Sequence, residues 1–349
     1  MRLGLNMGYW GAGNDADNLE LAREADRLGY SVVWAAEAYG SDAATVLTWV
    51  AAQTEQIDVG SAIFQIPART PAMTAMTAAT LDTLSGGRFR LGLGISGPQV
   101  SEGWHGVRFD SPLGRTREYI DIVNLALSRQ KVDYQGKHYQ VPLPGGPGKA
   151  LKLTAHPVRE HIPTYLAAIG PKNLELCGEM CDGWLAIFYS PEHSGESLEA
   201  ITKGRATAGL SMEGFDVVPT VPLVISDDLE QAAWAIRAYA ALYIGGMGSR
   251  EKNFYNQLAC RMGFEEAAAK IQDLFLGGDK AAAMAAVPLD FVDKTSLIGP
   301  IERVADRMQA YAAAGVTTLT IAVYAGEMEE RIATLRAGIE ALERSGVGS

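Results

Sequence analysis

The chain has 349 residues, of which 48% are hydrophobic and 20% are charged, and it carries a formal net charge of -11. This composition is typical of a globular protein with a large core, and the acidic balance argues against a surface that neutralises nucleic-acid phosphates. No apolar run approaches the ~20 residues that cross a membrane, and no apolar segment typical of a secretory signal follows Met1. We therefore expect a cytoplasmic protein that binds neither membranes nor nucleic acid.

Strand and helix patterns alternate from the beginning of the chain. Asn6 follows a short apolar strand, and the apolar spacing over residues 17–29 predicts a helix that ends at Gly29. The continuous β-branched run at 31–35 is typical of a parallel strand buried on both faces. The same alternation then predicts strands at 57–63 and 89–93 and helices at 71–84 and 115–128.

The second half of the chain continues the alternation but contains two interruptions. Residues 129–150 predict a hairpin excursion followed by a loop rich in Pro and Gly, and residues 245–295 predict a helical insertion. Between and after these segments the sequence predicts strands at 163–167, 183–187, 217–225 and 317–323 and a helix at 227–243.

Eight strands joined by helices predict a parallel barrel. We expect an α/β fold, a (β/α)8 TIM barrel with insertions, that forms a single domain over residues 1–349. An open doubly wound sheet is the alternative, but the glycine run from Gly8 to Gly13 contains Trp10 and makes a poor dinucleotide cradle.

Three stretches of sequence carry a resemblance to a known family. They are VGSAIFQ at 59–65, RTP at 69–71 and TLDTLSGGRFRLGLG at 80–94. Together they resemble the bacterial luciferase-like superfamily. The short loops beyond the strands and the lack of a flavin-oxygenase signature resemble its branch that uses the deazaflavin coenzyme F420, typified by methylenetetrahydromethanopterin reductase. This resemblance implies a cofactor at the carboxyl ends of the strands and a non-prolyl cis peptide at Ala62-Ile63, forming a bulge against the cofactor ring.

The candidate site residues lie just beyond the predicted strands, because those ends converge on one rim of a barrel. Gly170 opens a helix whose free amides attract an anion, so we assign the cofactor phosphate to its turn, as the resemblance also implies. The cofactor-binding candidates are Asn6, Tyr39, Ala62, Ile63, Gln65, Gly94, Ser96, Gly97, Ala168, Ile169, Gly170 and Pro171.

Glu37 is the candidate catalytic residue, as a proton donor or acceptor. A glutamate at this rim could equally pair with an arginine or cap a helix. His105 could contact cofactor or substrate or lie at the surface, and its neighbour Trp104 is expected to pack. Cys177 and Cys181 lie four apart and could share one face of a helix, but no matching pair of His or Cys residues completes a metal site, and the histidines show no ligand spacing. We therefore expect no metal.

The resemblance implies an F420-dependent oxidoreductase that transfers hydride between the deazaflavin and a small organic substrate. Two alternatives remain open, a reduced-FMN-dependent monooxygenase on the same fold and a barrel that binds a ligand without catalysis. A homodimer is expected, because symmetric dimers are the commonest oligomers.

Overall fold

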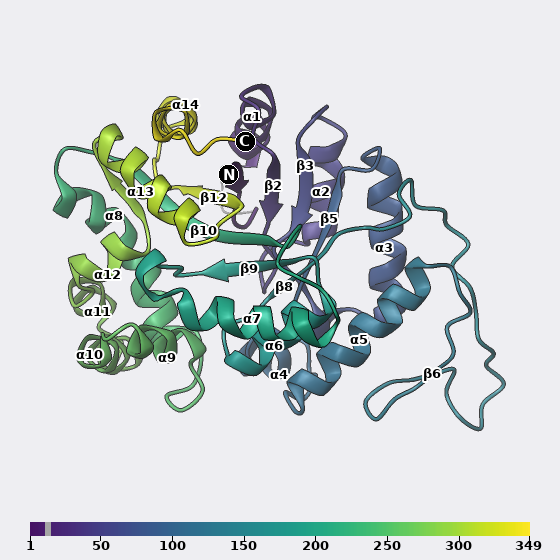
Figure 1. The fold of residues 1–349 in the computed structure, drawn as a ribbon. Helices are drawn as coiled ribbons and strands as arrows, with labels where there is room; N and C mark the ends of the chain where they lie inside the picture. The colour runs from purple at the N-terminus through teal and green to yellow at the C-terminus, as the bar shows by residue number, and fades with distance from the viewer. Residues whose placement is uncertain (11–14) are drawn as a thin grey trace.

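A computed structural model describes residues 1–10 and 15–349, and its centre is a closed barrel of eight parallel strands (Figure 1). The barrel closes because β1 pairs with β2 on one side and with β12 on the other. The strands are β1 (Arg2–Asn6), β2 (Val32–Ala35), β3 (Asp58–Ser61), β5 (Phe89–Gly94), β8 (Thr164–Ala167), β9 (Gly183–Ile187), β10 (Asp216–Ile225) and β12 (Thr318–Val323). The predicted (β/α)8 barrel is therefore confirmed.

Helices follow the strands and cover the outside of the barrel (Figure 1). They are α1 (Asp15–Arg27), α2 (Ala43–Ala51), α3 (Pro71–Leu84), α5 (Pro112–Leu127), α6 (Pro171–Met180), α7 (Gly195–Thr207), α8 (Leu229–Ala241), α13 (Ile301–Ala313) and α14 (Met328–Ser345). Local chemistry sets their starts. The Thr70 hydroxyl caps α3 by accepting a hydrogen bond from the Met73 amide at 3.2 Å, and Pro71 occupies the first helical position.

Two predicted strand assignments need correction. The strand expected at 57–63 ends at Ser61, and a separate two-residue strand, β4 (Phe64–Gln65), then pairs with the far end of β5. The strand β11 (Leu297–Gly299) was not predicted, because it is only three residues long and lies at the edge of the expected insertion. It pairs with the last residues of β10, beyond the part of β10 that pairs with β9.

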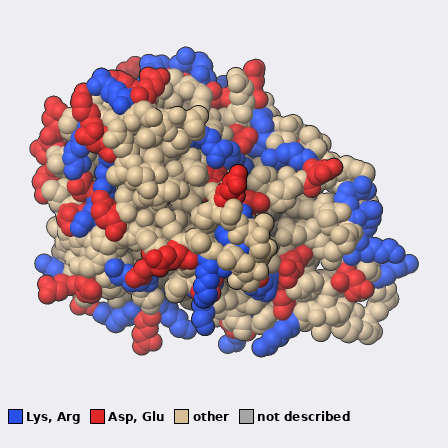
Figure 2. Space-filling model, in the orientation of Figure 1, with Lys and Arg blue, Asp and Glu red and all other residues tan. Residues whose placement is uncertain are grey.

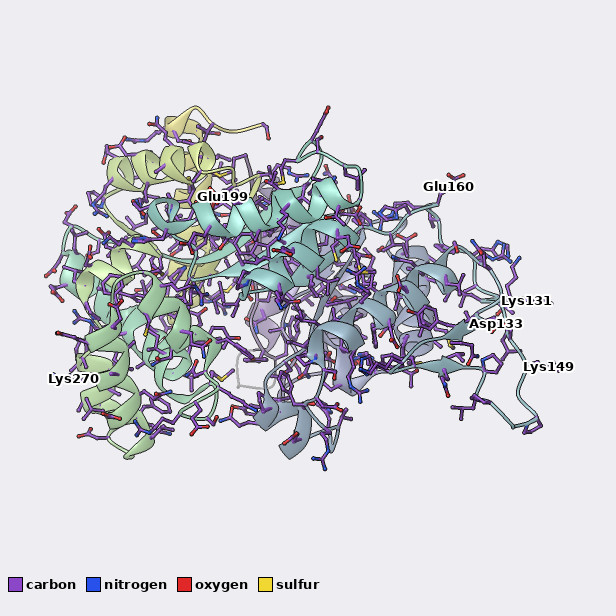
Figure 3. All side chains as sticks on the ribbon, turned by 60° about the horizontal axis from the view of Figure 1, so that its bottom comes forward. Lys131, Asp133, Lys149, Glu160, Glu199 and Lys270 are labelled. Carbon is purple, nitrogen blue, oxygen red and sulfur yellow. The ribbon has the colours of Figure 1, made fainter. Side chains whose placement is uncertain are left out.

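Two excursions lie at opposite ends of the molecule. The strands β6 (Tyr134–Gln135) and β7 (Gln140–Val141) form an antiparallel ribbon, from whose neighbourhood Lys131, Asp133 and Lys149 project (Figure 3). On the other side lie α9 (Phe254–Arg261), α10 (Glu265–Leu276), α11 (Lys280–Ala285) and α12 (Leu289–Lys294), which share an apolar core with α8 (Figure 1). The remaining pieces are α4 (Pro98–Gly103), two 3-10 turns, η1 (Ile66–Ala68) and η2 (Pro191–His193), and a π-helical turn, η3 (Leu242–Gly246).

The sequence motif at 80–94 contains a structural clamp. Asp82 is fully buried, and its carboxylate accepts hydrogen bonds from the Val158 amide at 2.9 Å and from Arg159 Nε at 2.8 Å. Arg88 donates to the carbonyl oxygens of Ala51 and Ile57. Charge-assisted bonds of this kind tie loops between neighbouring strands to the barrel wall.

A buried charged network fills the amino-terminal end of the barrel. Asp216, the first residue of β10, accepts hydrogen bonds from Tyr165 at 3.0 Å and from Thr318 at 2.8 Å. Its carboxylate also pairs with Arg2 and Arg90, each at 3.2 Å, and Arg90 Nε lies 2.7 Å from Asp58 Oδ2. The network joins side chains from β1, β3, β5, β8, β10 and β12. It therefore closes this end of the barrel.

The described helices include none long and apolar enough to cross a membrane. Among the same residues, no three His, Cys, Asp or Glu side chains are arranged to hold a metal ion. Basic and acidic side chains are interspersed over the face seen in Figure 2.

We predict that Arg90→Met strongly destabilises the fold, because it leaves Asp216 and Asp58 without their shared buried cation. Breaking a buried pair from one side costs about 3–5 kcal/mol. Urea unfolding followed by circular dichroism measures the loss. As a control, Lys203→Met removes an exposed pair with Glu175 and should leave the midpoint nearly unchanged. Equal midpoints for the two variants would contradict the prediction.

Candidate active site

The carboxyl-terminal end of the barrel is an open mouth lined by small side chains. Trp34 and Tyr165 pack together inside the barrel beside Val218, Ala62 and Leu185. Successive side chains along a strand point to opposite faces of the sheet, so every second residue counted from these inward residues also points into the barrel. This rule gives the inward positions nearest the mouth. They are Asn6, Ala36, Ala62, Gly94, Ala167, Ile187, Thr220 and Ala322, and all except Gly94 are partly exposed. The mouth is therefore not plugged by large side chains.

The wall between β3 and β5 is built around Ala62 and Ile63. The peptide bond that joins these two residues is cis, and both side chains are partly exposed. A Cβ added at Gly94 would lie 2.0 Å from Ile63 Cδ1 and 3.5 Å from the Ala167 Cβ. The missing side chain of Gly94 therefore leaves room for Ile63 beside β8.

Gln65 connects the ends of three strands. Its Nε2 donates to the Ala38 carbonyl at 2.8 Å, and its Oε1 accepts from the Ser96 hydroxyl at 3.0 Å. Gln65 is 1% exposed, whereas Ser96 is partly exposed and has a φ of 57°. A buried amide with both ends bonded holds the loops after β2 and β5 in a fixed relation.

Glu37 is paired with an arginine rather than free. Its Oε1 lies 2.7 Å from Arg69 Nη2, and its Oε2 accepts from the Gln65 amide at 3.3 Å. Arg69 also bonds Asp42, and its guanidinium lies 4.6 Å from the centre of the Phe64 ring. The side chains of Glu37 and Arg69 are 9% and 13% exposed. The sequence left open whether Glu37 acts on a proton or has a structural partner. The structure shows that it pairs with an arginine.

The turn at Gly170 opens α6 on the far side of the mouth. Gly170 is the N-cap and Pro171 the first helical residue, and a Cβ added at Gly170 would meet nothing within 4 Å. The neighbouring Ile169 carbonyl accepts a hydrogen bond from Arg261 of α9 at 3.4 Å, and Ala168 is buried with its carbonyl bonded to Trp184. Pro171 has no amide hydrogen, and the Asn173 amide donates to the Gly170 carbonyl at 2.9 Å, so the positive end of the α6 dipole and the exposed Arg261 are what favour an anion here.

A hollow extends from this turn toward α7 and α9. Its lining residues are Ala168, Ile169, Trp184, Ile187, Phe188, Tyr189, Ser190, His193, Ser194, Ser197, Leu258 and Met262. The hollow therefore continues the mouth on the Gly170 side, and it is lined by serine hydroxyl groups and apolar side chains.

The remaining candidates lie around the rim. Asn6 Oδ1 accepts from the Gly8 amide at 2.7 Å, Tyr39 is 62% exposed, and Gly97 begins α4 with open space beside it. His105 is partly buried. Trp104 was expected to pack but is 66% exposed, because the loop after α4 turns it toward solvent.

Several residues at the mouth were not identified from the sequence. Arg69 was part of a recognised motif, but only the fold shows that it meets Glu37. Arg261 lies in the insertion, 92 residues from its partner, and carries no local signal. Tyr9 and Tyr243 were missed because nothing in their own segments brings a loop after β1 against a turn after α8.

The fold and this mouth define a barrel enzyme of the TIM type, with its site at the carboxyl ends of the strands. A family model for luciferase-like monooxygenases matches residues 7–318. The chain is also 45% identical over 342 residues to a Mycobacterium tuberculosis protein named for a proposed coenzyme F420-dependent oxidoreductase activity, covering 96% of this chain and 99% of that one. The chain belongs to the luciferase-like monooxygenase family.

More distant relatives share the whole architecture. A 5,10-methylenetetrahydromethanopterin reductase of Archaeoglobus fulgidus is 28% identical over 299 residues, 84% of this chain and 85% of that one. The solved F420-dependent tetrahydromethanopterin reductase from Methanopyrus kandleri superposes with a TM-score of 0.81 at 24% identity, over 96% of this chain and 97% of that one. An F420-dependent secondary alcohol dehydrogenase gives 0.79 at 16% identity, over 99% and 98%. At these identities the structural likeness shows the fold alone.

We predict that Gly92→Ala disrupts the floor of the mouth. An added Cβ would lie 1.8 Å from the Ser61 carbonyl oxygen, and the backbone of both strands would have to move. Overpacking of this kind costs about 1–3 kcal/mol. Differential scanning calorimetry should show a lower Tm. Gly103→Ala, where an added Cβ meets nothing within 4 Å, is the matched control and should not lower the Tm.

Proposed function

We propose that this chain is an F420-dependent oxidoreductase that transfers hydride between the deazaflavin and a small organic substrate. The observation that carries the proposal is the open mouth around Ala62-Ile63 in a chain 45% identical, almost end to end, to a relative named for F420 dependence. Its substrate class is developed in the next subsection.

The residues at the mouth fit a planar ring with a phosphate-bearing tail. Ala36, Ala62, Ala167 and Ala322 are small and partly exposed, so a flat ring can lie over them without a side chain in its way. Gly170 leaves space for a bulky anion beside the α6 amides, and Arg261 stands next to that space. Ala62 and Ile63 would support the ring, and Gly170 with its following turn would hold the phosphate.

Bound F420 would supply a ring carbon that carries hydride, so the chain's own residues are left with binding, orientation and the exclusion of water. Gln65 and Ser96 fix the loops on one side of the ring site, and Asn6 and Tyr39 border it at the neighbouring strand ends. Gly94 and Gly97 keep the backbone close to the ring site without a side chain. Substrate would enter from the exposed side of the mouth.

Glu37 is best explained as a positioning residue. Both carboxylate oxygens of Glu37 already have partners, the Arg69 guanidinium and the Gln65 amide, which hold the side chain in one place. We infer that it fixes Arg69 and the loop that carries Gln65.

Two rival functions use the same mouth. Reduced FMN also has a planar ring and a phosphate, so a monooxygenase that uses it could occupy the same mouth. A barrel that binds a ligand without catalysis would use the mouth but would not need a redox cofactor there. The likeness in sequence to relatives named for F420 favours the deazaflavin over FMN.

The expected homodimer is also a proposal. Trp49 of α2 and Met73 and Met76 of α3 are about half exposed on neighbouring helices, and an apolar face of this kind suits a self-complementary interface.

We predict that the purified protein binds one F420 per chain and binds FMN much more weakly. Gly170→Glu should weaken F420 binding by at least about tenfold, because a carboxylate then faces the phosphate. Isothermal titration calorimetry gives both constants, and an unchanged Tm shows that the variant is folded. Stoichiometric FMN binding without F420 binding would replace this proposal by the monooxygenase, and binding of neither would favour the ligand-binding barrel.

We predict that Arg69→Gln destabilises the protein by roughly 3 kcal/mol, because it leaves the Glu37 carboxylate buried without its cation. Glu37→Gln should cost less, because Arg69 keeps its pair with Asp42. The double variant should lose less than the sum, as a double-mutant cycle measured by urea unfolding would show. In a turnover assay, Glu37→Gln should keep the pH dependence of the unmodified enzyme. A pH profile flattened by Glu37→Gln would instead make Glu37 the proton donor or acceptor.

A further inference from the structure

Five tyrosines from separate segments gather on one side of the mouth. Tyr9 follows β1, Tyr239 lies in α8, Tyr243 in the π-helical turn η3, Tyr255 in α9 and Tyr324 directly after β12. The ring centres are 4.7 Å apart for Tyr239 and Tyr243, 4.8 Å for Tyr243 and Tyr255, and 6.0 Å for Tyr239 and Tyr324. We call these five residues the tyrosine wall.

The tyrosine wall borders the mouth rather than the outer surface of the insertion. β1 and β12 are neighbours whose last pair is Asn6 and Ala322, both mouth residues, so Tyr9 and Tyr324 leave the barrel side by side. The hydroxyl groups of Tyr9 and Tyr243 lie close enough to act on each other's pKa. Phe188 lies just beyond β9, and its ring centre is 5.3 Å from that of Tyr239 and 5.9 Å from that of Tyr243. The wall therefore spans the side of the mouth from β9 to β1.

The wall is electrically neutral. Burial raises the pKa of Tyr255 to about 12 and raises the pKa of Tyr243 well above its ordinary value. The electrostatic neighbours that act most on Tyr239 and Tyr243 are other tyrosines of the wall. The hydroxyl groups remain protonated at neutral pH, so they can donate hydrogen bonds but cannot compensate a buried charge on a ligand.

The π-helical turn fixes the position of Tyr243. Asn253 is 1% exposed, and its Nδ2 donates to the carbonyl oxygens of Tyr243 at 3.0 Å and Ile244 at 2.9 Å. Gly245 and Gly246 pack against Phe275, because an added Cβ would lie 2.6 Å from the Phe275 Cβ at Gly245 and 2.3 Å from the Phe275 ring at Gly246. A π-turn leaves carbonyls without their usual helical partners, and such turns are common at functional sites. Asn253 supplies the missing donors.

We propose that Tyr243 and Tyr9 bind the oxygen of a neutral carbonyl or alcohol substrate, and that the tyrosine wall selects substrates with an apolar ring over anionic ones. Tyr243 donates a hydrogen bond to that oxygen while the aromatic faces contact the ring. Asn253 is a positioning residue for Tyr243. The inference rests on the proposed function, because it places the substrate beside the cofactor site.

Acetophenone and benzoate are matched probes, alike in size and ring but different in charge. Ligand-observed NMR on the protein, with and without F420, measures the binding of each, and calorimetry measures F420 itself. We expect acetophenone to bind more tightly than benzoate. Tyr243→Phe should weaken acetophenone binding by about three- to tenfold, the effect of one hydrogen bond, while leaving F420 affinity within twofold.

Two further variants make the test specific. Asn253→Asp keeps the acceptor that caps α9 through the Tyr255 and Asn256 amides but removes the donor to Tyr243, so it should weaken acetophenone binding as Tyr243→Phe does. Tyr134→Phe removes a hydroxyl bonded to Asp121 in the remote ribbon and should change neither affinity. Tighter binding of benzoate, or unchanged acetophenone affinity in Tyr243→Phe, would overturn the inference. Loss of F420 binding by the unmodified protein would overturn the proposed function instead.

Discussion

The carboxylate of Asp216 is the interaction on which the barrel depends. It lies at the start of β10 and collects hydrogen bonds or ion pairs from Arg2, Arg90, Tyr165 and Thr318, which come from four other strands. A buried charge is tolerated only when it is fully compensated, so these strands must keep their relative positions for the network to exist. One end of the barrel is thereby closed and fixed by polar contacts.

The other end is open, and most of its inward positions carry small side chains. Above Trp34 and Tyr165, which fill the barrel interior, the next inward layer contains Ala36, Ala62, Gly94, Ala167 and Ala322. The large aromatic side chains form a floor, and the small residues above them leave room for a flat ligand. A binding mouth results from the order of large and small residues along each strand rather than from any special loop.

The motifs that carry the family resemblance contribute both to the barrel frame and to the mouth. Asp82 and Arg88, within the recognised motif, bond backbone groups and hold loops to the barrel wall. Other motif residues lie at the mouth itself: Ala62, Ile63, Gln65 and Gly94, and Arg69, which pairs with Glu37. Substrate selectivity is assigned here to Tyr9, Tyr243 and Tyr324, which lie in segments that the motifs do not cover.

The sequence by itself determined the barrel, since its strands are buried on both faces and leave an unmistakable alternation of apolar runs and amphipathic helices. It also placed Ala62, Ile63, Gln65 and Gly170 at strand ends, because residue order along a parallel barrel dictates which positions meet one rim. Only the tertiary structure decided that Glu37 meets Arg69, that Arg261 reaches Ile169 and that Tyr9 meets Tyr243. Those contacts join residues far apart in the chain, and a side chain's partner across such a distance depends on packing that no local pattern records.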